Sequence, residues 1–368
     1  MSAGREAKGR VMPLAEWPPA DRAAWAEALT GADLFDPVPR PALRWRASTR
    51  EATRGGYGRW LAWLDGAGLL DRSASFASRV TRSRVAAYAA DLAATGSGFS
   101  VAGRIQQLGD ALRAIAPHDD WGWVLRGSGR LRARAVPAKD KHARMQSPYD
   151  LVELGLELMR RGDTDVHATA LTRAKLHRDG LMIALLARRP MRGGNLGAIA
   201  LGQHLRRHGA AWSLTFTPEQ TKQARHLEPS WPGELVEPLE RHLAVHRPRL
   251  LAGTRKALPP TDRLWVSAHG TAMSYAAVAL QIKARTAAAF GASVNPHLFR
   301  DCAATAIATC APEQARDVAL VLGHAGLATS ERHYNHARML GANARHQDGV
   351  EATRQREAAA KPKRGQGA

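Results

Sequence analysis

Apolar residues recur at helical spacing along most of the chain. In the first third, Tyr57, Trp60 and Leu64 follow Thr53 at intervals of three or four residues, the period of a helix with one buried face. We interpret this stripe as part of a hydrophobic core. Similar spacing predicts helices over residues 20–29, 80–93, 101–115, 150–160, 168–187, 235–245 and 274–290, and again from Asn295 onward.

A single β patch interrupts the helical pattern. Trp212, Leu214 and Phe216 alternate with polar or smaller residues, the period of a half-buried strand. We therefore predict short strands over 201–204, 212–217 and 225–229. The expected fold class is mainly α with a small antiparallel β-sheet.

The chain of 368 residues is long enough for two domains. Between them lies a strongly basic stretch, in which Gly127, Gly129 and Pro137 argue against one continuous helix. We expect an N-terminal extension over 1–40, a helical domain over 41–125, a basic interdomain linker over 126–147, a mixed α/β domain over 148–349 and a flexible C-terminal tail over 350–368.

Charge narrows the class of partner. The formal net charge of +20 points to a polyanion, most often nucleic acid. A membrane surface is the alternative, but the charge is spread along the chain rather than set on one amphipathic helix. The N-terminus lacks an apolar signal core, and the longest apolar run, residues 181–187, is too short to span a bilayer. We expect a cytoplasmic protein with access to DNA.

Cysteine usage adds little chemistry. Cys302 and Cys310 are the two cysteines of the chain, which is too few for a disulfide framework. No set of cysteines and histidines has the spacing of a zinc motif. We interpret both cysteines as small apolar core residues.

The chemistry-bearing residues lie mainly in the second half of the chain. Arginines, a lysine and imidazoles that can surround a phosphate are followed by one phenol nucleophile, as a metal-free phosphoryl transfer to tyrosine needs. In chain order the candidates are Arg192, Lys222, His297, Arg300, His324 and Tyr334.

His297 and Arg300 lie three residues apart at the start of a predicted helix. Asn295 is a suitable N-cap and Pro296 suits the first turn. The positive end of a helix favours a phosphate. Taken alone, an H-x-x-R pair is a weak signal, since it also describes an ordinary surface pair.

Arg192 and Lys222 have rivals nearby. Arg192 follows the break at Pro190, and Arg188 and Arg189 share its loop. Lys222 follows a turn between two predicted strands, where an ordinary turn lysine is the alternative interpretation. Arg225, three residues further on, could serve in its place.

His324 and Tyr334 complete the set. His324 follows Leu322 and Gly323, and Gly323 suits the end of a helix that starts at Pro312. A histidine that only stabilises a helix end is the alternative. Tyr334 follows His324 by ten residues, and the other tyrosines lie outside these motifs.

The order and local contexts of these residues resemble the tyrosine recombinase (phage integrase) family. The segments PMRGGNLGAIAL, PHLFRDCAATAIA and LGH carry the resemblance, which spans residues 45–345. It implies a helical core-binding domain that contacts DNA, a mixed α/β catalytic domain, and site-specific recombination of mobile-element DNA through a 3′-phosphotyrosyl intermediate and a Holliday junction. It also implies a homo-tetramer assembled on double-stranded DNA in the cytoplasmic nucleoid, with accessory DNA-bending proteins and without metal or cofactor.

Two departures from the family pattern keep alternatives open. An acidic residue commonly stands three positions after the first catalytic arginine, where this chain has Asn195, and the gap before Tyr334 is ten rather than about nine residues. A type IB topoisomerase and a non-catalytic DNA-binding relative are the two other hypotheses. The cations expected to contact DNA phosphates are Arg126, Arg130, Arg132, Arg134, Lys139, Lys141, Arg144, Arg188, Arg189 and Arg225.

Overall fold

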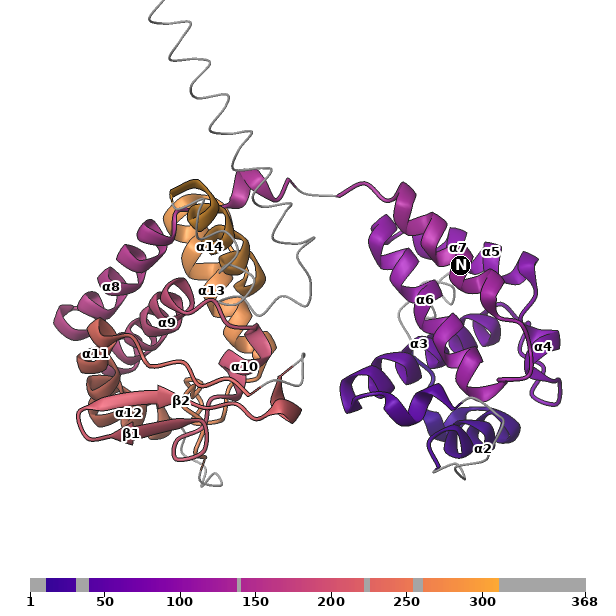
Figure 1. Ribbon diagram of the computed structural model, residues 1–368, viewed down its shortest axis with the longest axis horizontal. Helices are drawn as coiled ribbons and strands as arrows, with labels where there is room; N and C mark the ends of the chain where they lie inside the picture. Colours follow the sequence, from indigo (N-terminus) through magenta and orange to yellow (C-terminus); the bar gives the residue numbers. More distant parts are fainter. Residues whose placement is uncertain (1–10, 31–39, 138–139, 222–225, 254–260, 311–368) are drawn as a thin grey trace, which may run out of the picture. The chain divides into compact units, whose positions relative to one another are not determined.

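The computed structural model describes residues 11–30, 40–137, 140–221, 226–253 and 261–310 (Figure 1). For residues 308–310 only the backbone is described. Contacts divide the chain into two compact units, Met1–Asp140 and Lys141–Ala368. No helix in the described ranges is long and apolar enough to cross a membrane. The domain boundaries expected from the sequence stay predictions.

The first unit is built from helices. Its aromatic stripe is core, as predicted: Trp60 is fully buried, and its ring makes an edge contact with Tyr88 at 5.2 Å between centroids. A buried carboxylate, Asp21, accepts hydrogen bonds from Tyr57 and Arg79. The helices are α2 (Pro19–Ala28), α3 (Ala47–Gly66), α4 (Phe76–Arg79), α5 (Arg82–Ala93), α6 (Gly98–Ile115) and α7 (Gly122–Arg134), with short 3-10 turns at Leu14–Glu16 and Pro41–Arg44.

The basic stretch over 126–144 is not one continuous helix, as expected, because α7 ends at Arg134 and a separate 3-10 turn spans His142–Arg144. Gly127 and Gly129 nevertheless lie inside α7. Val124 and Ser128 are buried, and the Ser128 hydroxyl donates a hydrogen bond to the Ala102 carbonyl of α6 at 2.9 Å. Packing against α6 therefore outweighs the helix cost of glycine, about 1 kcal/mol each.

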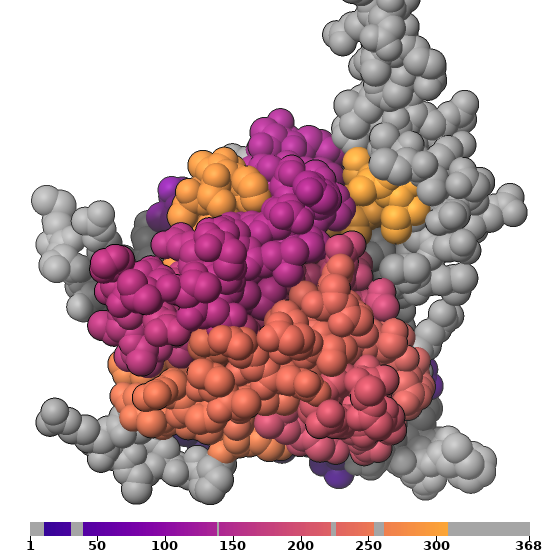
Figure 2. Space-filling model, turned by 90° about the vertical axis from the view of Figure 1, so that its left-hand side faces the viewer, coloured from indigo at the N-terminus to yellow at the C-terminus, as the bar shows by residue number. Residues whose placement is uncertain are grey.

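The second unit is arranged around helix α9. Every residue from Leu181 to Leu186 is fully buried, and Cys302 lies in the same core, as expected. Figure 2 shows one face of this unit. On this face the magenta surface of the α8 region lies beside the pink and orange surface of the residues that follow α10. Its helices are α8 (Pro148–Thr164), α9 (Ala170–Arg188), α10 (Gly193–Ala198), α11 (Val236–Arg241), the π-helical turn η7 (His242–His246), α12 (Arg247–Leu251), α13 (Tyr275–Phe290) and α14 (Pro296–Cys310), with 3-10 turns at His142–Arg144, Pro218–Gln220 and Gly233–Leu235.

The β patch is a two-stranded antiparallel sheet. Strand β1 (Leu205–His208) pairs with β2 (Ala211–Leu214), and isolated bridges join this region to residues 227 and 230. The first strand was expected over 201–204, which is wrong. Gly202 has a φ of 74° there, and the backbone N–H of Ala200 donates to Nδ1 of His204 at 3.2 Å, so this segment turns. The predicted fold class, mainly helical with a small antiparallel sheet, is confirmed.

Helices α8 and α9 approach so closely that their contact requires glycine. A Cβ atom added to Gly180 would lie 2.4 Å from the Gly155 carbonyl oxygen. We expect Gly180→Ala to lower the free energy of unfolding of this unit by about 1–3 kcal/mol, because the backbones must separate. Gly103→Ala on α6, where nothing lies within 4 Å, should instead stabilise by up to about 1 kcal/mol. Chemical denaturation measures both, and equal effects would contradict this packing.

Candidate active site

Arg300 is held in the second unit by a turn more than a hundred residues earlier in the chain. Arg300 is only 5% exposed, and its Nη1 donates a hydrogen bond to the Pro190 carbonyl at 2.7 Å. Pro190 belongs to the turn between α9 and α10, and Arg192, the N-cap residue of α10, follows two positions later. The fold therefore brings together the two arginines that the sequence motifs proposed.

The two guanidinium groups act on each other electrostatically. Burial, together with the positive charge of Arg192, lowers the pKa of Arg300 to about 10, while Asp301 acts in the opposite direction. Burial also lowers the pKa of Arg192. Both groups are cations at neutral pH, and their proximity is unfavourable until an anion approaches. An oxyanion such as a phosphate would be stabilised here by charge-assisted hydrogen bonds.

His297 lies one turn before Arg300 on α14. The Asn295 carboxamide oxygen accepts hydrogen bonds from the backbone N–H groups of His297 and Leu298, both at 3.0 Å. The predicted N-cap is thus confirmed. The imidazole of His297 is exposed at the positive end of a 15-residue helix, so it is accessible to an anion.

Two aromatic residues that the sequence did not assign to the site, Tyr275 and Trp265, contact helix α10. A Cβ atom added to Gly193 would lie 2.2 Å from Cε2 of Tyr275, so the ring rests directly on the glycine. The Trp265 indole donates a hydrogen bond to the Leu196 carbonyl at 2.8 Å. These contacts fix the start of α10 and hence the backbone of Arg192. Asn195, in the place of the family's acidic residue, is buried in this helix.

A basic segment at the start of the second unit contacts α14 and the residues just before it. Lys141 forms an ion pair with Asp301 at 2.8 Å. The Arg144 guanidinium donates hydrogen bonds to the Ser293 carbonyl, with Nε at 3.0 Å. Both cations were predicted to contact DNA. The structure adds an intramolecular role, because they hold the chain against the helix that carries His297 and Arg300.

The two rivals of Arg192 have partners elsewhere. Arg188 pairs with Glu234, with Nη2 2.9 Å from the carboxylate. Arg189 donates from Nε to the Ser230 carbonyl at 3.2 Å. Arg192 is the member of this loop whose charge lowers the pKa of Arg300. The family position of Arg192 is therefore the position at which the geometry supports a shared anion site.

Other predicted residues fall outside the described part of the chain. The 3-10 turn Pro218–Gln220 and its C-cap residue Thr221 are described, whereas Lys222, the next residue, is not. The roles expected for these residues stay predictions. They are Lys139, Lys222, Arg225, His324 and Tyr334.

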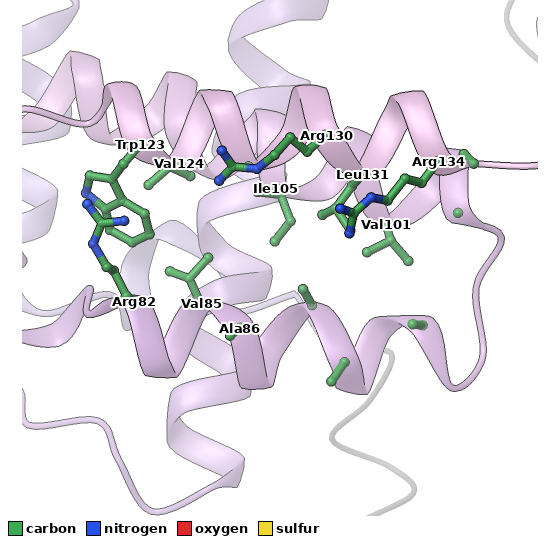
Figure 3. A pocket seen from close by; sticks show the side chains of 16 residues that line it. Arg82, Val85, Ala86, Val101, Ile105, Trp123, Val124, Arg130, Leu131 and Arg134 are labelled. Atoms are coloured by element: carbon green, nitrogen blue, oxygen red, sulfur yellow. The ribbon is translucent and has the colours of Figure 1, made fainter.

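The first unit presents exposed cations on α7. Figure 3 shows Arg130 and Arg134 on this helix beside a groove between α5, α6 and α7 of about 610 Å³. Val85, Val101 and Ile105 line the groove, so its floor is apolar. All four predicted DNA-contact arginines of α7 are exposed: Arg126, Arg130, Arg132 and Arg134.

Comparison with known proteins identifies the fold. No model of a known protein family and no curated protein matches the chain. Among solved structures, it is similar to the XerH site-specific recombinase bound to difH substrate before cleavage, with 15% identity, a TM-score of 0.50, and coverage of 90% of this chain and 97% of XerH. The post-cleavage complex of XerH with palindromic difH gives 14% identity and a TM-score of 0.51, over 91% and 97% of the two chains.

The similarity extends over both units and nearly the whole length of XerH. The chain therefore has the fold of a tyrosine recombinase. The resemblance that its motifs predicted is confirmed at the level of the fold.

Proposed function

We propose that the chain is a tyrosine-type site-specific DNA recombinase. One observation supports the proposal: Arg300, near the start of α14, donates to the Pro190 carbonyl two residues before Arg192, and the charge of Arg192 lowers the pKa of Arg300. The sequence motifs assign those two residues to the scissile phosphate. The recombinase fold and the net charge of +20 agree with DNA as the substrate.

The proposed reaction is a pair of phosphoryl transfers. The phenol oxygen of Tyr334 attacks the scissile phosphorus, forming a 3′-phosphotyrosyl bond while the bond to the 5′-oxygen breaks. Arg192 and Arg300 stabilise the charge on the non-bridging oxygens. Lys222 gives a proton to the departing 5′-oxygen, and His297 assists proton removal from the phenol. His324 donates a hydrogen bond to the phosphate.

The second transfer reverses the first with a different strand. The 5′-hydroxyl of a partner DNA attacks the phosphotyrosyl bond, releases Tyr334 and passes through a Holliday junction. The ester conserves the bond energy, so no ATP is needed, and the proposed steps take their charge stabilisation from the two arginines. We propose a homo-tetramer on two duplex sites, with residues 337–345 exchanged between protomers and accessory proteins bending the DNA.

Covalent trapping tests the proposal. Wild type, incubated with nicked duplexes from the DNA that flanks its gene, should give a slow, protease-sensitive adduct on a denaturing gel. Tyr334→Phe should give none, because the nucleophilic oxygen is absent. Tyr149→Phe, which changes an exposed tyrosine of α8, is the matched control and should still form the adduct.

Plasmid relaxation, measured beside covalent trapping, separates the two other hypotheses. A type IB topoisomerase would relax a generic plasmid without site preference, and Tyr334→Phe would abolish that relaxation. A non-catalytic relative would bind DNA in a salt-sensitive manner but form no adduct on any duplex, and Tyr334→Phe would behave as wild type. Either pattern would overturn the recombinase proposal.

A further inference from the structure

A second polar cluster lies in the same unit, at the middle of α9 and away from the arginine site. His177 of α9, His246 of the turn η7 and Asp163 near the end of α8 place one ligand atom each within 4.8 Å of one another. Eleven residues of α9 separate His177 from Arg188, a distance of about 16 Å along the helix axis. The cluster is therefore distinct from the candidate active site.

The imidazoles stack face to face, so one ring must turn before both can direct a nitrogen at the same ion. The rings of His177 and His246 stack with centroids 4.0 Å apart, and His242 lies parallel to His177 at 5.9 Å. The π-helical turn begins at His242 and ends at His246, between α11 and α12. Single π-helical turns within longer helices occur frequently at functional sites. Here the turn places both of its histidines toward α9.

One buried ring nitrogen of this cluster is left without a partner. His177 is only 1% exposed, and its Nδ1 forms no hydrogen bond with the described residues. A buried polar atom without a partner is costly unless a water molecule or an ion satisfies it. By contrast, Nε2 of His246 lies 2.8 Å from Oδ1 of Asp163. The cluster thus combines a satisfied pair with one buried donor or acceptor that is not used.

We propose that Asp163, His177 and His246 bind a divalent transition-metal ion such as Zn²⁺. Two imidazoles and one carboxylate are ligands that this ion prefers, and a fourth position would remain for water. The three ligands come from three different elements. A bound ion would therefore cross-link α8, α9 and the π-helical turn and stabilise the second unit.

One cation opposes a metal ion at this site. Arg241 places its Nε 2.7 Å from Oδ1 of Asp163. Arg241 neutralises the carboxylate and repels a cation.

Cobalt titration of the full chain tests the site. After chelator treatment and dialysis, Co²⁺ should produce visible d–d absorption bands, and Zn²⁺ but not Mg²⁺ should raise the unfolding temperature. His177→Gln or His246→Gln should weaken binding by at least about ten-fold, as ligand loss costs no less than the loss of an outer-shell partner. His208→Gln, at an exposed position of β1, is the matched control and should bind as wild type.

Arg241→Gln makes the test independent of folding defects in the histidine variants. Removing this cation frees the Asp163 carboxylate, so Co²⁺ should bind several-fold more tightly than in wild type. Unchanged affinity in Arg241→Gln and in His177→Gln would overturn the proposal. So would the absence of both absorption bands and Zn²⁺-dependent stabilisation in wild type. The cluster would then be only a buried hydrogen-bonded stack.

Discussion

Arg300→Ala is expected to reduce the rate of DNA strand cleavage by at least about 10²- to 10³-fold, the usual effect of removing one donor to a developing oxyanion. The guanidinium is fixed by its hydrogen bond to Pro190 and lies beside Arg192, so no neighbour can take its position. Arg300→Lys should recover little, because an ammonium group keeps the charge but cannot make the bidentate contact. Single-turnover cleavage of a nicked duplex at saturating protein measures the effect.

The control must separate chemistry from folding and DNA binding. Arg160→Gln removes an exposed arginine from α8, where it pairs with Glu157, and should cleave at the wild-type rate. Arg300→Ala should retain salt-sensitive DNA binding within a few-fold, because most phosphate contacts lie elsewhere. Cleavage by Arg300→Ala at the rate of Arg160→Gln would show that this arginine does not contact the reacting phosphate.

Asp179→Asn is expected to destabilise the second unit by about 3–5 kcal/mol, since it leaves the buried Arg178 and the half-buried Arg285 without their anion. Asp179 is fully buried and accepts hydrogen bonds from Arg178 at 2.9 Å and from Arg285 of α13 at 2.9 Å. Arg178 also donates to the Val266 carbonyl at 2.8 Å. The carboxylate thus joins α9, α13 and residue 266. The loss is a large fraction of a typical domain stability of about 5–15 kcal/mol.

The matched control for Asp179 is an exposed ion pair in the same unit. Glu157→Gln breaks the pair with Arg160 on α8 and should cost less than about 1 kcal/mol, because both side chains are solvated. Denaturant unfolding of the full chain, followed by fluorescence and far-UV dichroism, compares the two. Equal destabilisation by the two substitutions would contradict the structural role of Asp179.

Helical periodicity and capping residues predicted the architecture. Asn295 caps α14 as expected, and Gly291 ends α13 with a left-handed φ of 70°. The strand expected over 201–204 is wrong, because the segment around Gly202 turns instead. Gly127 lies inside α7 because neighbouring side chains are buried against α6.

The candidate site could be predicted only in part. The motif order suggested that Arg192 and Arg300 act together, but their contact through Pro190 depends on the folded chain. The ion pairs of Asp179 and the histidine cluster around His177 were not predicted, because each joins residues far apart in sequence. The sequence held one signal for each. These signals were a charged pair inside an apolar helix, Arg178–Asp179, and two histidines four residues apart, His242 and His246.

The measurement that tests the central claim most directly is mass spectrometry of the covalent protein–DNA adduct after protease and nuclease digestion. The proposed mechanism predicts a nucleotide attached through a 3′-phosphate to the peptide that contains Tyr334. Attachment at Tyr275, whose ring contacts the glycine next to Arg192, would contradict it. So would a DNA-bound protein with no modified tyrosine, because the arginine site would then bind phosphate without cleaving it.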